Sequence, residues 1–193
     1  MRSLFGGGLI HRFVRSLAWL SALVAAGLTL HSPASAKQPE VRIRTQGELS
    51  FGTFMVFGTG SRGVSSSGVV SDNSVVPLEG ITPQPARFSV EYDRGNNSRN
   101  SLDILIEVVI TTPGRQRFGG VEAEIAGLFA DLPGYRSVSS GETMQVRLRN
   151  CRARVCTQSF NVGGLLRVNR LYGGAKVDIP LAIDARVVSV DRE

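Results

Sequence analysis

Histidine and tryptophan are scarce in this sequence. Its 193 residues include two histidines and one tryptophan, and all three, His11, Trp19 and His31, lie within the first 36 positions. Histidine is the usual base that activates a serine or cysteine nucleophile, and it is the commonest ligand of transition metals. Beyond residue 36 the sequence has none. We therefore expect no enzymatic activity and no cofactor.

The first 36 residues have the layout of an export signal. Arginines come first, an uncharged apolar run follows at residues 17–30, and Ala-Ser-Ala closes the segment at residues 34–36. A helix over that apolar run measures about 21 Å, which is shorter than the hydrocarbon core of about 30 Å. We predict a cleaved signal peptide at residues 1–36. The protein would then be exported to the periplasm, the outer surface or the medium, with no membrane span after processing.

Residues 37–193 have a length that suits a single domain with one hydrophobic core. The predicted leader contains three arginines and no acidic residue, so its removal lowers the formal net charge of +6 by three units. The processed chain is therefore only modestly basic. Its charge alone points to no particular partner.

Cysteine is also rare, with only Cys151 and Cys156 in the stretch CRARVC. Four residues separate them, whereas thioredoxin-type motifs have two, and no histidine or second pair is available to complete a zinc site. In an exported protein we expect a disulfide that closes a tight loop and stabilises the fold by about 2 kcal/mol. A labile redox pair is the alternative.

Alternation of apolar and polar residues dominates the sequence after residue 36. It predicts strands at residues 86–92, 102–111, 142–149 and 176–187. Stretches rich in Gly, Asn and Ser separate these strands. One buried and one solvent-facing side per strand is typical of antiparallel sheets, and short strands with frequent turns favour a sandwich or barrel. The clearest buried face is that of Leu102, Ile104, Ile106, Val108 and Ile110. The sequence thus predicts an all-β, antiparallel β-sandwich.

The stretch GELSFGTFMVF at residues 47–57 is predicted to be the opening strand of the sandwich. It places Leu49, Phe51, Met55 and Phe57 on one parity, so we expect these four side chains to share the buried face.

Two other segments depart from simple alternation. Residues 121–132 carry apolar side chains at helical spacing and stop before Pro133, so one short helix between strands is an alternative there. Pro180 lies inside the predicted strand 176–187 and has no backbone N–H for a ladder, which indicates a sheet edge or a bulge. Sheet edges matter because they can accept a partner strand.

Four arginines lie around the cysteine pair, and they are Arg147, Arg149, Arg152 and Arg154. Arginine forms bidentate contacts with carboxylate and phosphate groups, so this cluster is a candidate patch for an acidic surface polysaccharide or a lipopolysaccharide headgroup. No aromatic residues interleave with these arginines, so we expect no binding of nucleic acid. A solvated polar face beside a hairpin is the simpler interpretation.

Acidic residues offer no stronger candidate. The pairs Asp178 and Asp184, and Glu122 and Glu124, are interpreted as solvent-facing positions of strands or of the short helix. The loop DRGNNSRN at residues 93–100 has oxygen-bearing side chains, but it lacks the ligand spacing of an EF-hand. We assign no catalytic or metal-binding residue.

Several stretches together carry a family resemblance: LSFGTFMV, GETMQVRLRN and FNVGGLLRVNRLYGGAKVDIPLAI. With these, residues 47–187 resemble a domain family of unknown function found in exported bacterial proteins, which is similar to spore-coat-U-like and chaperone-usher pilin proteins. The resemblance implies an immunoglobulin-like sandwich that is secreted and takes part in surface fibres or coats.

Our leading hypothesis is an exported, non-enzymatic surface or structural protein, pilin-like or coat-like. Its expected partners are further copies of itself or a periplasmic chaperone, bound through sheet edges. The alternative is a glycan- or cell-surface-binding, adhesin-like module that uses the arginine cluster. The sequence leaves open whether the sandwich is complete in one chain or needs a donated strand.

Overall fold

The computed structural model describes residues 37–192, so the predicted signal peptide at residues 1–36 lies outside the described residues. The segment that begins at Lys37 forms one compact unit. Regular secondary structure in the described range consists of strands only. They are β1 (Glu40–Gly47), β2 (Leu49–Val64), β3 (Val70–Pro77), β4 (Ala86–Asp93), β5 (Leu102–Thr111), β6 (Gln116–Phe118), β7 (Val121–Ala130), β8 (Thr143–Cys151), β9 (Val155–Arg170), β10 (Gly174–Ile179) and β11 (Ala182–Arg192).

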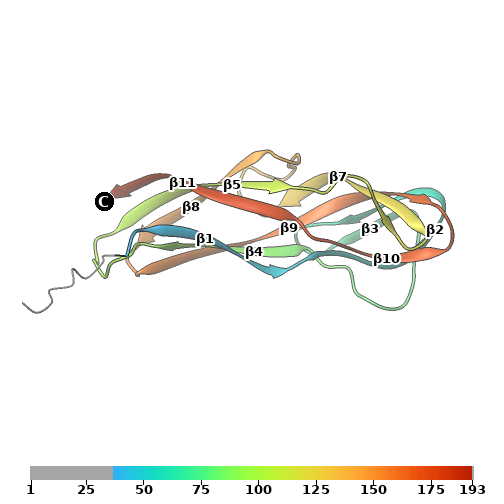
Figure 1. The fold of residues 1–193 in the computed structure, drawn as a ribbon, viewed down its shortest axis with the longest axis horizontal. Helices are drawn as coiled ribbons and strands as arrows, with labels where there is room; N and C mark the ends of the chain where they lie inside the picture. The colour runs from blue at the N-terminus through green and yellow to red at the C-terminus, as the bar shows by residue number, and fades with distance from the viewer. Residues whose placement is uncertain (1–36, 193) are drawn as a thin grey trace, which may run out of the picture. The chain divides into compact units, whose positions relative to one another are not determined.

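These strands form two antiparallel sheets (Figure 1). The smaller sheet has the order β11-β5-β8, and the larger one contains the path β1-β4-β9-β2-β10 with β3, β6 and β7 attached to it. All strand pairings are antiparallel. The prediction of an all-β, antiparallel sandwich is confirmed.

The long strand β9 divides the domain into two halves. Its first half pairs with β4 through residues 155–162, and its second half pairs with β2 through residues 164–169, while β7 lies on the opposite side. We call the part where the smaller sheet covers β1, β4 and early β9 the two-layer half. We call the part built from β2, β3, β6, β7, β10 and late β9 the curled half (Figure 1).

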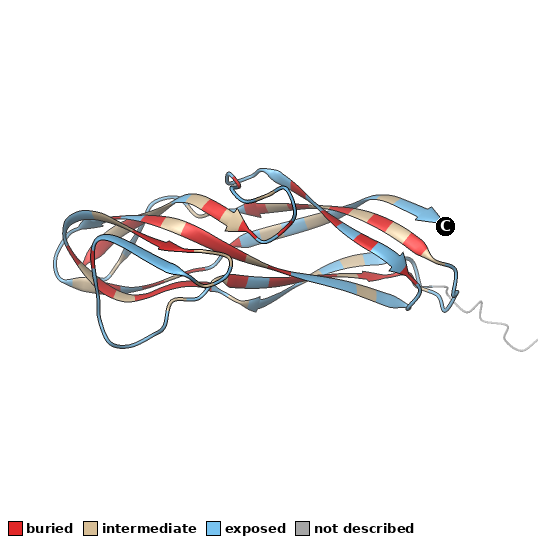
Figure 2. Cartoon of the chain, turned by 180° about the vertical axis from the view of Figure 1, so that it is seen from behind, coloured by how far each residue is buried: buried red, intermediate tan, exposed pale blue. Residues whose placement is uncertain are grey.

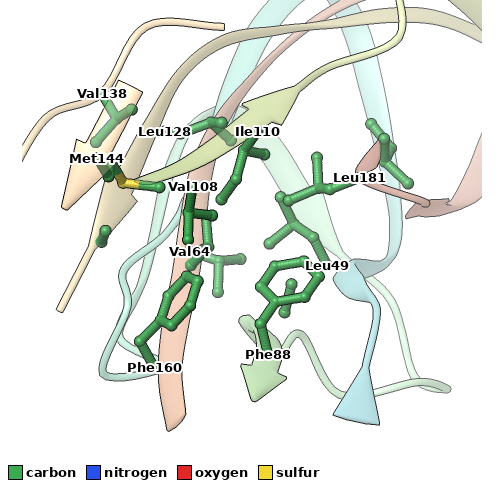
Figure 3. Packing of buried hydrophobic residues seen from close by; sticks show 14 of the residues in the cluster. Leu49, Val64, Phe88, Val108, Ile110, Leu128, Val138, Met144, Phe160 and Leu181 are labelled. Carbon is green, nitrogen blue, oxygen red and sulfur yellow. The ribbon is translucent and has the colours of Figure 1, made fainter. Parts of the chain in front are cut away.

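One hydrophobic core runs through both halves. Phe51, Phe54, Phe88 and Phe160 are among its largest fully buried side chains, and the rings of Phe88 and Phe160 lie 5.7 Å apart between centroids. Figure 3 shows Phe88 and Phe160 near Val64, Val108 and other aliphatic side chains. Burial of these apolar surfaces is the main source of the fold's stability.

The predicted alternation of β5 is confirmed in full. Every second residue from Leu102 to Ile110 is buried, and the residues between them are half-buried. The same alternation of buried and exposed positions is visible along several strands in Figure 2. A half-buried opposite face is expected for a strand that lies between β11 and β8 at the surface of a two-layer sandwich.

The predicted buried face of residues 47–57 is correct only for its first part. Leu49 and Phe51 are fully buried, but Phe54 and Val56 replace Met55 and Phe57 in the core. The cause is Gly52, whose φ of 70° lies in the left-handed region and whose neighbourhood carries a register shift against β10. This bulge exchanges the two faces of β2, and it leaves Phe57 70% exposed.

The short helix considered for residues 121–132 is wrong, because Val121–Ala130 forms strand β7. A register shift between Ile125 and Gly127 changes which parity faces the core. Buried positions therefore fall at Val121 and Ala123 before the bulge and at Leu128 and Ala130 after it. In a strand with such a bulge, the apolar residues fall at sequence intervals that resemble those of a helix.

The predicted strand over residues 176–187 is two strands rather than one. Pro180 and Leu181 lie between β10, which pairs with β2, and β11, which pairs with β5. The proline thus marks the point where the chain crosses from one sheet to the other. The apolar face remains buried only as far as Leu181, and Val187 on β11 is exposed.

Candidate functional site

The predicted disulfide is present and joins Cys151 at the end of β8 to Cys156 near the start of β9. Their Cα atoms lie 5.9 Å apart, which is an ordinary separation for a disulfide. Asn150, just before the bridge, has a φ of 53°, and asparagine tolerates this left-handed conformation better than most residues. The bridge therefore fixes the tight connection between β8 and β9.

The structure brings together two of the four predicted arginines. Arg147 and Arg149 extend from β8 and line the same groove, which has a volume of about 650 Å³. Arg154 instead forms an ion pair with Asp93 at 3.5 Å. Arg152 is exposed in the loop between β8 and β9 and does not line this groove.

The groove beside β8 also contains polar groups that the sequence did not single out. Tyr135, Gln145 and Gln158 line it together with the two arginines. Tyr135 and its neighbours belong to the connection between β7 and β8, whereas Gln158 comes from β9. Guanidinium, amide and phenol groups can donate hydrogen bonds, so this groove has the chemistry to hold an anionic, hydroxyl-rich ligand.

A second groove, of about 580 Å³, crosses β2, β3, β7 and β9 in the curled half. Arg115 lies beside both predicted surface carboxylates there, at 3.1 Å from Glu124 and 3.8 Å from Glu122. Ser74 in this groove has a φ of 57°. Its two acidic residues thus have a cationic partner, and Arg167 also lines this groove.

The other carboxylates considered above have structural partners. Asp178 accepts a hydrogen bond from the Ser50 hydroxyl and forms an ion pair with Lys176 at 2.9 Å. Burial raises the pKa of Asp178, but these two hydrogen bonds outweigh it and leave a lowered pKa. Asp184 accepts a hydrogen bond from the backbone N–H of Ala185. Neither residue has the environment of a catalytic acid.

Asp93 connects three parts of the two-layer half. Its carboxylate lies 2.6 Å from Lys37 Nζ and accepts a hydrogen bond from the backbone N–H of Gly95, while Arg154 approaches from the β8–β9 loop. The hydrogen bond from Lys37, followed by that from Gly95, lowers the pKa of Asp93 to about 2 against the opposing effect of burial. Asp93 thus ties the segment before β1 to the end of β4.

The two outer strands β1 and β11 border one side of the two-layer half. β1 pairs only with β4, and β11 pairs only with β5, so each has a free backbone edge within the described chain. Their Cα atoms come within 8 Å of each other without forming a ladder. Val187, Val188 and Val190 of β11 are 36%, 49% and 41% exposed.

β1 covers the core only thinly. Val41 and Ile43 are its apolar residues, and both are half-buried against the hydrophobic core. β1 lies close to β11 at this side of the sandwich, and its two apolar residues pack against the core.

A helix long and apolar enough to cross a membrane is not found among residues 37–192. Likewise, the described residues contain no group of three or more His, Cys, Asp or Glu side chains placed to hold a metal ion.

Comparisons with known proteins identify a family but no activity. No curated protein and no solved structure matches the chain. Residues 41–176, from the second residue of β1 to the first part of β10, match one family of protein domains. This match covers the Gly-rich β9 strand and the early Leu-x-Phe-Gly strand that suggested a family of unknown function. The chain belongs to the family described as Domain of unknown function (DUF4402).

Proposed function

We propose that this chain is an exported, non-enzymatic surface or structural protein that associates with further copies of itself through the side bordered by β1 and β11. It would act as a pilin-like or coat-like subunit. The disulfide supports an oxidising compartment. The predicted leader at residues 1–36 is consistent with the same route.

The observation that carries this proposal is the combination of free backbone edges and exposed valines on β11. An unpaired edge presents a row of N–H and C=O groups that can hydrogen-bond to a strand of another chain. Proteins that remain monomeric protect such edges with charged side chains, above all lysine. Val187, Val188 and Val190 instead expose apolar surface in the middle of this strand, between Arg186 and Asp191, which favours association.

Lysine substitution at the β11 edge tests the proposal. We expect Val188→Lys combined with Val190→Lys to turn an oligomeric protein into a monomer, because the new charges oppose strand pairing. A matched control is Val69→Lys with Val70→Lys, since these valines are also exposed but lie in the curled half. Size-exclusion chromatography with light scattering gives the mass of each variant. Equal masses for both double variants would contradict the proposal.

A periplasmic chaperone is the second partner expected at the same edges. If a chaperone occupies the β11 edge, it should co-purify with the unmodified protein and with the Val69/Val70 control, but not with the Val188/Val190 variant. Recovery of a chaperone with all three proteins would place its binding elsewhere.

The groove beside β8 supports a second candidate function, the binding of an acidic surface polysaccharide. Its two arginines have no carboxylate partner within ion-pair distance among the described residues. Retention on immobilised polygalacturonate measures this activity. We expect Arg147→Ser with Arg149→Ser to abolish retention, and Arg152→Ser with Arg154→Ser to preserve it, because the latter pair lies outside the groove. Retention by the Arg147/Arg149 variant and its loss in the Arg152/Arg154 variant would rule out the groove as the binding site.

A further inference from the structure

Two arginines of this domain are buried to the same extent but have different surroundings. Arg62 on β2 and Arg94 after β4 are each 4% exposed. Arg62 Nε lies 3.1 Å from the carboxylate of Asp72, and its guanidinium lies 5.4 Å from the ring centroid of Phe54. The charge of Arg62 is therefore balanced inside the curled half.

Arg94 has hydrogen bonds but no balancing charge. Its Nη1 donates to the backbone carbonyl oxygens of Asn100 at 2.9 Å and Cys151 at 3.3 Å. Its Nε, like that of Arg62, is buried without a hydrogen-bond partner, so the two arginines differ in the nearby carboxylate and not in this respect. Within residues 37–192, no carboxylate lies within ion-pair distance of Arg94. The adjacent Asp93 contacts Lys37, Gly95 and Arg154 instead.

Burial of a guanidinium without an anion is unfavourable. Removing a charged group from water costs several kcal/mol, and backbone carbonyls compensate for this only in part. Buried charges in proteins are accordingly paired with an opposite charge or with a bound ion. The unbalanced charge of Arg94 thus suggests that an anion from outside the described chain completes its environment.

A cavity is present at the place where such an anion would bind. It has a volume of about 210 Å³ and lies where the segment before β1, the ends of β4 and β11 and the start of β5 meet. Its polar lining consists of Tyr92, Arg94, Asn96, Ser98, Asn100 and Arg192. The lining thus holds two guanidinium groups and several hydrogen-bond donors, and it contains no Asp or Glu among the described residues.

The size and lining favour a small organic acid. At about 30 Å³ per water molecule in the liquid, the cavity has room for a carboxylate and the few carbon atoms attached to it. Leu102 and Val190 supply apolar surface for those carbon atoms. Burial raises the pKa of Tyr92, so its phenol stays protonated at neutral pH and remains a donor.

We propose that this cavity is a carboxylate-binding site, in which Arg94 and Arg192 bind a small organic acid. Arg94 is held by the carbonyls of Asn100 and Cys151, so it is oriented before the ligand arrives. Arg192 is exposed at the end of β11 and closes the site from the solvent side. This site is separate from the groove beside β8, which shares none of its lining residues.

Thermal unfolding of the purified protein in sodium acetate tests the proposal, with sodium chloride at the same ionic strength as reference. A ligand that binds only the folded state raises the melting temperature in a saturable way. At ten times the dissociation constant, we expect a rise of about 3 to 6 °C above the value in chloride. Isothermal titration with acetate measures the same affinity independently.

Arg192 is the residue to substitute, because replacing Arg94 would also remove two hydrogen bonds that hold the fold. We expect Arg192→Ser to lose the acetate-dependent rise and the heat of binding. Arg186→Ser is the matched control, since Arg186 lies on the same strand but pairs with Glu107 outside the cavity, and it should keep both signals. Equal melting temperatures in acetate and chloride, or an unchanged rise in Arg192→Ser, would overturn the proposal.

Discussion

In the curled half, Gly120 between β6 and β7 donates a backbone hydrogen bond to Gly174 at the start of β10, whereas in the two-layer half β1 and β11 meet without a ladder. The outer strands are thus arranged differently in the two halves. In the curled half the β6–β7 turn meets the start of β10, although β3 still pairs with β2 alone. The two-layer half keeps two free edges side by side, and one of them carries exposed valines.

This difference indicates where a partner can bind. Both halves share one hydrophobic core and the long strand β9, so packing alone does not distinguish them. They differ in backbone groups left without a partner strand and in the side chains around those groups. Association is therefore expected on the side of β1 and β11, and substitutions in the curled half should affect folding rather than association.

The largest expected effect is that of Gly120→Ala in the curled half. A Cβ atom at Gly120 would overlap the backbone carbonyl of Tyr172, and backbone cannot move aside as a flexible side chain can. We expect a loss of more than about 4 kcal/mol in the free energy of unfolding, or failure to fold. Gly114→Ala is the control, because its Cβ would meet no atom within 4 Å. Equal urea midpoints for both variants would show that a Cβ atom at position 120 fits beside the backbone of Tyr172.

The next largest effect concerns a cross-strand pair between β5 and the outer strand β11. Ile106 on β5 pairs with Val187 on β11, yet Ile106 is fully buried and Val187 is exposed. We expect Ile106→Ala to lower the free energy of unfolding by about 2 to 5 kcal/mol. Val187→Ala should change it by less than about 0.5 kcal/mol. A large loss of monomer stability in Val187→Ala would mean that this valine is packed rather than available to a partner.

Removal of the disulfide should have a smaller effect. Replacing Cys151 and Cys156 by serine releases a short loop, so we expect the free energy of unfolding to fall by about 2 kcal/mol. The bridge joins β8 to β9, which β5 and β4 separate from β11 and β1, and the oligomeric mass should remain unchanged. Denaturant unfolding and light scattering measure the two quantities. Loss of association in this variant would show that the bridge is needed for association through the side bordered by β1 and β11.

The smallest expected effect is a pH dependence of the contact before β1. The pKa of Asp93 is lowered from 3.8 to about 2 in the folded protein. Asp93 therefore contributes stability above pH 3.8, and this contribution is lost as the pH falls toward 2. We expect the unfolding midpoint of the unmodified protein to decline more steeply over this range than that of Asp93→Asn. Parallel pH profiles would show that Lys37 does not hold this carboxylate in its charged form.

Local patterns predicted much of the fold. The alternation in Leu102–Thr111 identified a strand and its buried face correctly, because β5 has no bulge that changes its parity on the core side. The same reasoning failed at the bulges at Gly52 and between Ile125 and Gly127. A bulge shifts every later side chain to the opposite face, and its position depends on the partner strand, which the sequence does not identify.

The candidate site was less predictable than the fold. The disulfide followed from the cysteine pair and the predicted export. Arg147 and Arg149 were found as members of the arginine cluster around the cysteine pair, and both lie at exposed positions of β8. Arg94 was missed, since in the sequence DRGNN it has the character of a turn residue. Its burial depends on the carbonyls of Asn100 and Cys151, and the latter is distant in sequence.

The mass of the purified, processed protein over a range of concentrations shows whether the chain associates with further copies of itself. We predict that light scattering will show oligomers whose mass rises with concentration. Deletion of residues 37–45, which removes most of β1 and its Lys37 contact, should abolish this rise, and circular dichroism should still show β structure. A stably folded protein that stays monomeric at every concentration and binds no chaperone would contradict the proposed function.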